Sequence, residues 1–123
     1  MISGIVTGDH QAIIPVTVRG PTGQERNIEA ILDTGFDGWL SLPASLVAAL
    51  ELVWRRRGRA LLADGSESVF DIYEATVVWD GQARRISVDE AETAPLVGMG
   101  LLEGHEIIIQ IRTGGVVTIR SLP

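Results

Sequence analysis

Several residue types that support common chemistries are missing from this sequence. There is no cysteine, which excludes disulfide scaffolds, thiolate metal sites and cysteine nucleophiles. All ten basic residues are Arg, so neither Schiff-base chemistry nor a phosphate-binding Lys is available. The two histidines, His10 and His105, lie far apart along the chain, which argues against a multi-histidine metal centre. We therefore expect neither a metal nor a cofactor.

Long hydrophobic runs are also missing. The most apolar stretch, Leu40 to Trp54, is broken by Pro43 and Glu51 and is too short to span a bilayer. Residues 1–4 lack the basic and apolar regions of a signal peptide. The net charge of −6 argues against a general nucleic-acid binder. These features predict a soluble, cytoplasmic protein with no membrane or nucleic-acid partner.

What the chain does contain is typical of a small β-rich domain. Its 123 residues, 1–123, are expected to form a single domain with one core. Val, Ile and Thr contribute 12, 13 and 8 residues, and there are 14 glycines. Many β-branched residues separated by glycines indicate short strands joined by tight turns.

Turn signals divide the chain into strand-like segments. Asp64-Gly65, Asp80-Gly81 and Gly114-Gly115 each predict a hairpin. The segment Gln11 to Arg19, which precedes the turn signal Pro21-Thr22-Gly23, contains Pro15, which is typical of an edge strand. Pro43 to Leu50 predicts a helix, with Ser41 as its cap and Pro43 in its first turn. The expected strands are Gln11–Arg19, Arg26–Leu32, Trp54–Leu62, Val69–Trp79, Arg84–Val88, Glu106–Ile111 and Val116–Ile119.

Residues 31–38 carry the strongest chemical signal. The run Ile-Leu-Asp-Thr-Gly-Phe-Asp-Gly is an apolar strand that ends in a carboxylate, a hydroxyl and a glycine. A given tripeptide occurs by chance in roughly 3% of chains this long, so this motif alone also fits an ordinary strand-ending turn. Two further segments follow in order, a hairpin tip at residues 61–66 and an apolar, glycine-containing segment at residues 96–102.

On these three segments the chain resembles the retropepsin-like aspartic proteases. It is most similar to the single-domain bacterial and archaeal branch, whose active-site loop reads Asp-Thr-Gly-Phe. The resemblance implies an all-β fold: a closed acid-protease β-barrel with one or two short helices and one lobe per chain. It also implies an aspartic endopeptidase that hydrolyses a peptide or protein substrate.

The resemblance implies a role for each matching residue. Asp33 would be the catalytic aspartate, with Thr34 bonding across a dimer axis and Gly35 letting the substrate backbone approach. Asp37 and Val97 would contribute to the substrate pocket, and Val97 would also pack beneath the active-site loop. The expected flap tip, which closes over the substrate, consists of Ala63, Asp64, Gly65 and Ser66.

Aspartic proteolysis needs two carboxylates that share one proton, one taking a proton from water and the other giving one to the carbonyl oxygen. This chain has a single Asp-Thr-Gly. A second copy of the chain must therefore supply the second aspartate, which predicts a homodimer. In the family the terminal strands interleave in a shared sheet, which here would be Met1 to Val6 and Val116 to Pro123.

Two positions depart from the family pattern. Phe36 cannot donate a hydrogen bond to the dyad, so we expect a mildly acidic or neutral pH optimum rather than the strongly acidic one of pepsin. Met99 replaces the Arg that pairs with the position of Asp37 in viral members. Asp37 should therefore either pair with an arginine among residues 55–59 or face the substrate.

Other features leave alternatives open. Leu32, Val97 and Leu101 are expected pocket walls and predict a preference for apolar substrate side chains. The arginines at residues 55–59 fit a solvated strand edge, and the three tryptophans fit core positions or subsite walls. The alternative function is a peptide-binding or dimerisation module that keeps the fold without catalysis.

Overall fold

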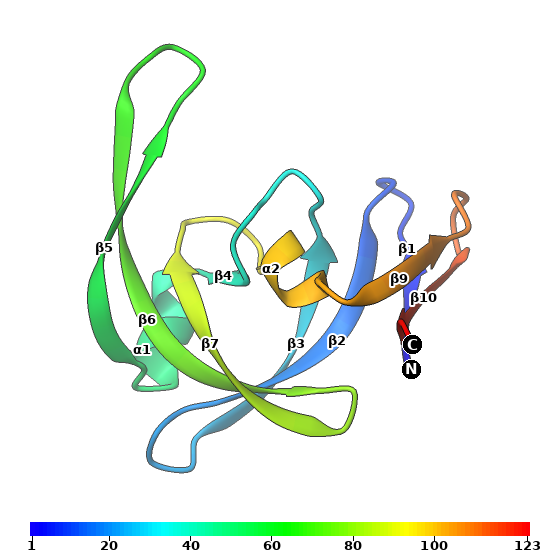
Figure 1. Ribbon diagram of the computed structural model, residues 1–123, viewed down its shortest axis with the longest axis horizontal. Coiled ribbons are helices and arrows are strands. Elements are labelled where there is room, and N and C mark those ends of the chain that lie inside the picture. The colour runs from blue at the N-terminus through cyan, green and yellow to red at the C-terminus, as the bar shows by residue number, and fades with distance from the viewer.

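The computed structural model describes residues 1–123 as ten strands and two short helices (Figure 1). The N-terminal half contains β1 (Ile2–Val6), β2 (Ala12–Arg19), β3 (Glu25–Leu32), β4 (Leu40–Leu42), α1 (Ala44–Ala49) and β5 (Val53–Leu61). The C-terminal half contains β6 (Glu67–Trp79), β7 (Gln82–Glu90), β8 (Leu96–Val97), α2 (Met99–Leu102), β9 (His105–Ile109) and β10 (Val116–Ser121). Neither helix is long and apolar enough to cross a membrane.

All ten strands belong to one sheet, in the order β5-β6-β7-β4-β8-β3-β2-β1-β10-β9. An additional pairing between β6 and β2 closes the six strands from β6 to β2 into a ring. The β5–β6 hairpin projects from one side of this ring, and β1, β10 and β9 extend from the other (Figure 1). The structure confirms the expected all-β barrel with short helices.

The inside of the ring holds a single cluster of buried apolar side chains. Alternation along β2 buries Ile14, Val16 and Val18, as expected for a strand with one face toward the core. Leu101 and Leu102 of α2 complete the core beneath the loop that follows β3. The core therefore supports the segment that carries the Asp-Thr-Gly motif.

The three predicted hairpins are present. Asp80 and Gly81 both have positive φ, 51° and 80°, which is the backbone of the tight turn that favours Asp-Gly. At the β5–β6 tip, Gly65 has φ 86° and donates its N–H to the carbonyl of Leu62 at 3.0 Å. Turn chemistry read from the sequence therefore placed these hairpins correctly.

Pro15 does not mark an edge strand, contrary to the prediction. Strand β2 lies inside the sheet, with β3 along one edge and both β1 and β6 along the other. Pairing with β1 ends at Ile13, and pairing with β6 begins at Thr17. Pro15 falls between these two partners, so that edge makes no demand on its missing N–H.

The predicted cap of α1 was wrong. Pro43, not Ser41, occupies the N-cap position, and no side chain of the cap residue bonds the helix. Glu92 supplies the missing acceptor instead, because its Oε1 accepts the N–H of Ala44 at 3.1 Å. Ser41 is a buried residue of β4.

The terminal strands pair with each other inside one chain. Strand β10 lies between β1 and β9, with Ile2 opposite Ile119 and Val117 opposite Ile109. The sharing of these strands with a second chain stays a prediction. Within the chain, the free edges of the sheet are β5 and β9.

Candidate active site

Asp33 stands where β3 ends, at the start of the loop that leads to β4. Its backbone N–H donates to the carbonyl of Val97 at 2.9 Å, because β8 runs parallel to β3 at this point. Its side-chain Oδ1 accepts the N–H of Gly35 at 2.9 Å. These two bonds fix the backbone and one oxygen of a half-buried carboxylate, which leaves the other oxygen available.

Backbone hydrogen bonds also fasten the far side of this loop, residues 33–39, to the segment that begins α2. The N–H groups of Gly98 and Met99 donate to the carbonyls of Trp39 and Phe36 at 3.0 and 2.8 Å. A third bond joins the Gly100 N–H to the carbonyl of Gly38 at 2.9 Å. The loop is therefore rigidly attached although it contains no regular secondary structure.

Phe36 explains why two glycines are needed here. A Cβ on Gly98 would lie 2.3 Å from the carbonyl oxygen of Gly38 and 2.6 Å from the Phe36 ring. A Cβ on Gly38 would lie 2.5 Å from the same ring. The large side chain at position 36 is accommodated because its neighbours have none.

Thr34 is exposed and points to the other side of the loop. Its hydroxyl makes no hydrogen bond within the chain, and it lines a cavity of about 420 Å³. The rest of that cavity is mainly apolar and includes Leu32, Ile109 and Ile111. Ile111 is 74% exposed, so a sizeable apolar surface lies open beside Thr34.

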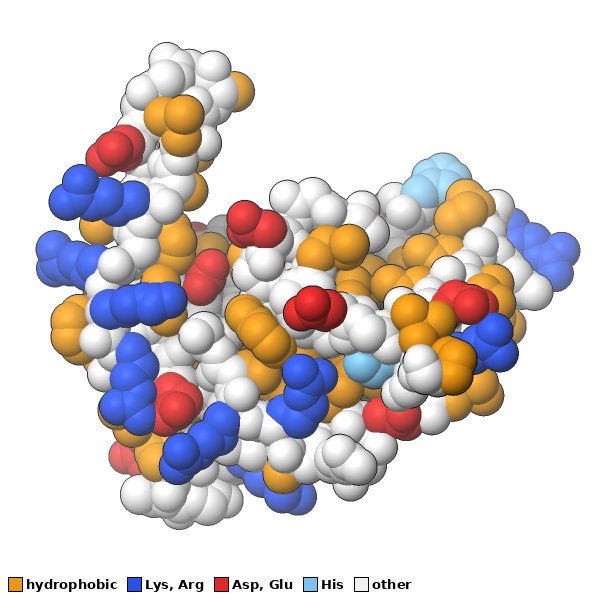
Figure 2. Space-filling model, in the orientation of Figure 1, with side chains coloured by type: hydrophobic (Ala, Val, Ile, Leu, Met, Phe, Trp, Pro, Cys, Tyr) orange, Lys and Arg blue, Asp and Glu red, His pale blue; other side chains and the backbone are white.

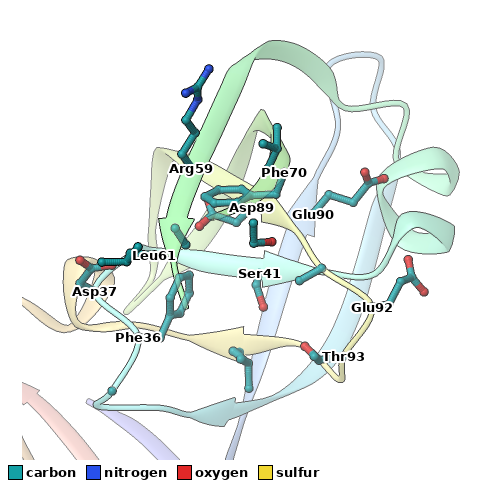
Figure 3. A pocket seen from close by; sticks show the side chains of 16 residues that line it. Phe36, Asp37, Ser41, Arg59, Leu61, Phe70, Asp89, Glu90, Glu92 and Thr93 are labelled. Carbon is teal, nitrogen blue, oxygen red and sulfur yellow. The ribbon is translucent and has the colours of Figure 1, made fainter. Parts of the chain in front are cut away.

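A larger cleft of about 860 Å³ separates the same loop from the projecting β5–β6 hairpin (Figures 2 and 3). Three parts of the chain form its walls: the loop after β3, the middle of the hairpin, and the β7–β8 connection. The lining residues are Gly35, Phe36, Asp37, Ser41, Arg59, Ala60, Leu61, Ser68, Val69, Phe70, Asp89, Glu90, Ala91, Glu92, Thr93 and Leu96.

Two carboxylates, those of Asp37 and Asp89, line this cleft. Asp89 Oδ2 would lie 3.3 Å from a Cβ on Gly38, which places its carboxylate against the loop. Burial raises the pKa of Asp89, the nearby charge of Asp37 raises it further, and Arg56 partly opposes both effects. Neither Asp37 nor Asp89 forms an ion pair with an arginine.

The arginines of β5 form ion pairs with the neighbouring strand β6 instead. Arg55, Arg57 and Arg59 pair with acidic residues of β6, with the Arg57–Asp71 and Arg59–Glu67 pairs at 3.7 and 3.6 Å. Figure 2 shows basic side chains along this outer edge. The predicted solvated edge is confirmed, and the alternative that Asp37 pairs with an arginine among residues 55–59 is wrong.

The hairpin tip has its own polar structure. Asp64 Oδ1 accepts hydrogen bonds from the N–H and hydroxyl of Ser66, at 2.9 and 2.5 Å, and these bonds lower the pKa of Asp64. Ala63 and Gly65 are exposed beside them. None of the four tip residues lines the cleft, because the hairpin points away from the loop in this structure (Figure 1).

Four predicted positions need correction. The side chains of Val97 and Leu101 are completely buried in the core, so neither can be a pocket wall. Val97 instead contributes its carbonyl to Asp33. Leu32 lines the apolar cavity beside Thr34 rather than the large cleft. Trp54 is 53% exposed and bonds Asp71, and is thus not a core residue.

Sequence reasoning missed several residues of the cleft. Ser41, Phe70 and Asp89 come from strands whose pairing brings them to the loop, and no local motif marks them. Only the family-like positions Gly35 and Asp37 were predicted among the lining residues. No group of three or more His, Asp or Glu side chains is arranged to hold a metal ion.

No family model and no curated protein matches the chain. Among solved structures, it is similar to the crystal structure of a retropepsin-like aspartic protease from Rickettsia conorii, with a TM-score of 0.60 and 16% sequence identity. The similarity covers 97% of this chain and 90% of that chain. At this level of identity the likeness establishes the fold, and the chain is therefore an all-β lobe of the retropepsin-like type.

Proposed function

We propose that the protein is an aspartic endopeptidase whose active site forms between two copies of the chain. The observation that carries this proposal is the fastening of Asp33. Its loop is bonded to Val97 on one side, and its carboxylate is oriented by the N–H of Gly35. A rigid, half-buried carboxylate two residues before Gly35, where the lining of a large cleft begins, is suited to acid–base chemistry on a bound peptide.

The chemistry follows from pairing Asp33 with the same residue of a second copy. Two adjacent carboxylates share one proton, because both cannot ionise at such close range. The ionised carboxylate takes a proton from water, whose oxygen attacks the peptide carbonyl carbon. The protonated carboxylate gives its proton to the carbonyl oxygen, and the resulting tetrahedral diol collapses as the amine leaves with a proton.

A second copy would also account for the surface beside Thr34. The free Thr34 hydroxyl and the apolar cavity lined by Leu32, Ile109 and Ile111 lie on the same side of the loop. A twofold axis there would cover the apolar surface and give the hydroxyl a partner. In the same assembly the β5–β6 hairpin would act as a flap, with Ala63 to Ser66 closing over the substrate.

Replacing the catalytic carboxylate tests the proposal. Asp33→Asn should lower kcat for a denatured protein or a peptide library to background, because an amide cannot take a proton from water. Its mass in solution should equal that of the wild-type dimer. Asp9→Asn, a substitution of an exposed aspartate outside the site, is the matched control and should retain full activity.

The same experiment separates the proposal from its alternative. A wild-type protein that binds peptides but cleaves none between pH 3 and 8 would identify a non-catalytic peptide-binding module. Full cleavage by Asp33→Asn, or full activity of a strictly monomeric wild type, would contradict the shared dyad. Inhibition of the wild type by a statine-containing peptide, which mimics the tetrahedral diol, would support the enzyme.

A further inference from the structure

We infer that the cleft between the β5–β6 hairpin and the loop after β3 selects a basic side chain, Arg or Lys, of the peptide substrate. This inference rests on the proposed function and names the substrate class of that site. It differs from the apolar preference expected from the sequence, because two of the three expected walls, Val97 and Leu101, are buried in the core.

The charged side chains that line the cleft are mainly acidic. Four carboxylates line it, from Asp37, Asp89, Glu90 and Glu92, against the single cation of Arg59. The Arg59 guanidinium already faces Glu67 at 3.6 Å and points away from the other labelled side chains (Figure 3). Glu92 is engaged by the N–H of Ala44. Asp37, Asp89 and Glu90 make no ion pair in the chain.

Asp89 lies against the loop that carries the proposed catalytic aspartate. Its carboxylate lies against Gly38 of the loop that begins at Asp33, so it borders the proposed scissile region. Asp37 belongs to that same loop and is exposed. The charge of Asp37 disfavours ionised Asp89 and Arg56 offsets this only in part, so a bound cation would relieve the remaining repulsion.

Ser41 supplies an independent observation. It lies beside Asp89 in the β4–β7 pairing and forms part of the cleft wall. Only 3% of the residue is exposed, and its Oγ has no hydrogen-bond partner. An unpartnered buried hydroxyl is costly, and a donor N–H from a guanidinium or ammonium group would satisfy it. Figure 3 shows Ser41 on β4, with Asp37 and Glu92 on either side of it in this view.

The remaining walls suit the stem of such a side chain. Phe36 and Phe70 present aromatic rings, and Leu61 and Leu96 add aliphatic surface. Arg and Lys bury their methylene stems against apolar groups while their charged ends reach polar ones. Aromatic faces also attract a guanidinium directly. The cleft thus combines apolar walls with the carboxylate of Asp89 and the hydroxyl of Ser41.

Matched peptides that differ at one residue test the inference. Peptides with Arg, norleucine or Glu next to the scissile bond should be cleaved by the wild type with kcat/KM about tenfold higher for Arg than for norleucine, and lowest for Glu. Asp89→Asn and Asp37→Asn should each reduce the Arg preference to about threefold or less. Asp9→Asn should keep the wild-type preference, and about 0.5 M salt should weaken it.

A binding measurement keeps failure of the inference distinct from failure of the proposed function. Uncleavable peptides with a reduced peptide bond and the same three residues are titrated into the wild type by calorimetry. Tighter binding of the Arg peptide, lost in Asp89→Asn, supports the cleft assignment even if no peptide is cleaved. Equal or tighter binding of the norleucine peptide overturns it, whether or not cleavage occurs.

Charge reversal provides a variant that does not depend on loss of function. Asp37 is exposed, so Asp37→Lys should fold, as circular dichroism will check. This variant should bind the Glu peptide more tightly than the wild type does, by about tenfold, and the Arg peptide more weakly. An unchanged order of affinities would overturn the inference.

Discussion

At the candidate site, glycines without side chains make room for the large side chain of Phe36. Phe36 occupies space that Gly38 and Gly98 leave free, and the backbone bonds between their segments require that closeness. The glycine at position 98 therefore reflects packing rather than turn geometry, because a Cβ there would meet the Gly38 carbonyl oxygen at 2.3 Å.

Gly98→Ala tests this packing. The added methyl group must displace backbone or the Phe36 ring, so we expect a loss of roughly 1–3 kcal/mol in the free energy of unfolding. Urea denaturation measures it. Gly8→Ala is the control, since a Cβ at Gly8 meets nothing within 4 Å. A Gly98→Ala variant as stable as Gly8→Ala would contradict the clash.

Asp89 makes stability depend on pH. Its pKa is raised in the folded state by burial and by Asp37, so the folded protein binds this proton more tightly than the unfolded chain does. The protonated Asp89 carboxyl therefore adds to the free energy of unfolding below the ordinary Asp pKa of about 3.9. This added stability is lost as pH rises through the raised pKa of the folded state. Ionised Asp89 therefore destabilises the fold at neutral pH.

Asp89→Asn should accordingly raise the melting temperature at pH 7 by a few degrees. Near pH 3 the gain should disappear, because both the wild-type carboxyl and the amide are then neutral. Differential scanning calorimetry across this pH range measures the effect, with Asp9→Asn as the control. A variant that melts below the wild type at pH 7 would show that Asp89 is needed for packing.

At the scale of elements, the β5–β6 hairpin contrasts with the ring from which it grows. Nearly every residue of β5 is exposed, and β6 is its only neighbour in the sheet. Its cross-strand ion pairs are exposed and add little to stability. We therefore expect the outer part of the hairpin to move relative to the loop that carries Asp33.

Hydrogen exchange can measure this difference. Amides of residues 58–69 should exchange faster than those of β2 and β3, whose hydrogen bonds lie inside the ring. Addition of a statine-containing peptide should slow exchange in the hairpin if it closes as a flap. Equal protection of the hairpin and the ring in the free protein would contradict an independently mobile hairpin.

The elements were largely predictable because turn chemistry is local. Asp80-Gly81 and Gly114-Gly115 predict hairpins because their turns use positive φ angles, which few residue types adopt. The role of Pro15 was not predictable, since it depends on where two distant strands, β1 and β6, stop pairing with β2. The cap of α1 likewise comes from Glu92, far along the chain.

The candidate site likewise has a part that the sequence predicts and a part that depends on distant strand pairing. Asp33, Thr34 and Gly35 form a continuous motif that the sequence displays directly. Ser41 and Asp89 reach the cleft only through the parallel pairing of β4 with β7. Because parallel pairing joins segments separated by long connections, no local pattern in the sequence could reveal these residues.

At the scale of the whole molecule, the proposed contact with a second copy lies on the apolar surface beside Thr34. Ile111→Glu places a charge on this surface at a residue that is 74% exposed, so folding of the single chain should be unaffected. Light scattering across a dilution series should show dimer dissociation at a concentration at least about tenfold higher than for the wild type.

A control substitution of similar character isolates this effect. Val53→Glu alters an exposed apolar residue of β5, away from Thr34, and should leave the dissociation constant unchanged. Proteolytic activity should fall together with the dimer population in Ile111→Glu. Wild-type association in Ile111→Glu would place the interface elsewhere.

Ring closure by β2 and β6 leaves the sheet with two unlike ends. A fibre grows only if the edge strand at one end of the sheet pairs repeatedly with the edge strand at the other end of the next molecule. At one end, β5 carries a row of arginines that discourages such addition. At the other, β9 offers Ile107, Ile108 and Ile109. Association along the strand edges should therefore stop at pairs, which protects concentrated solutions of this protein from polymerisation.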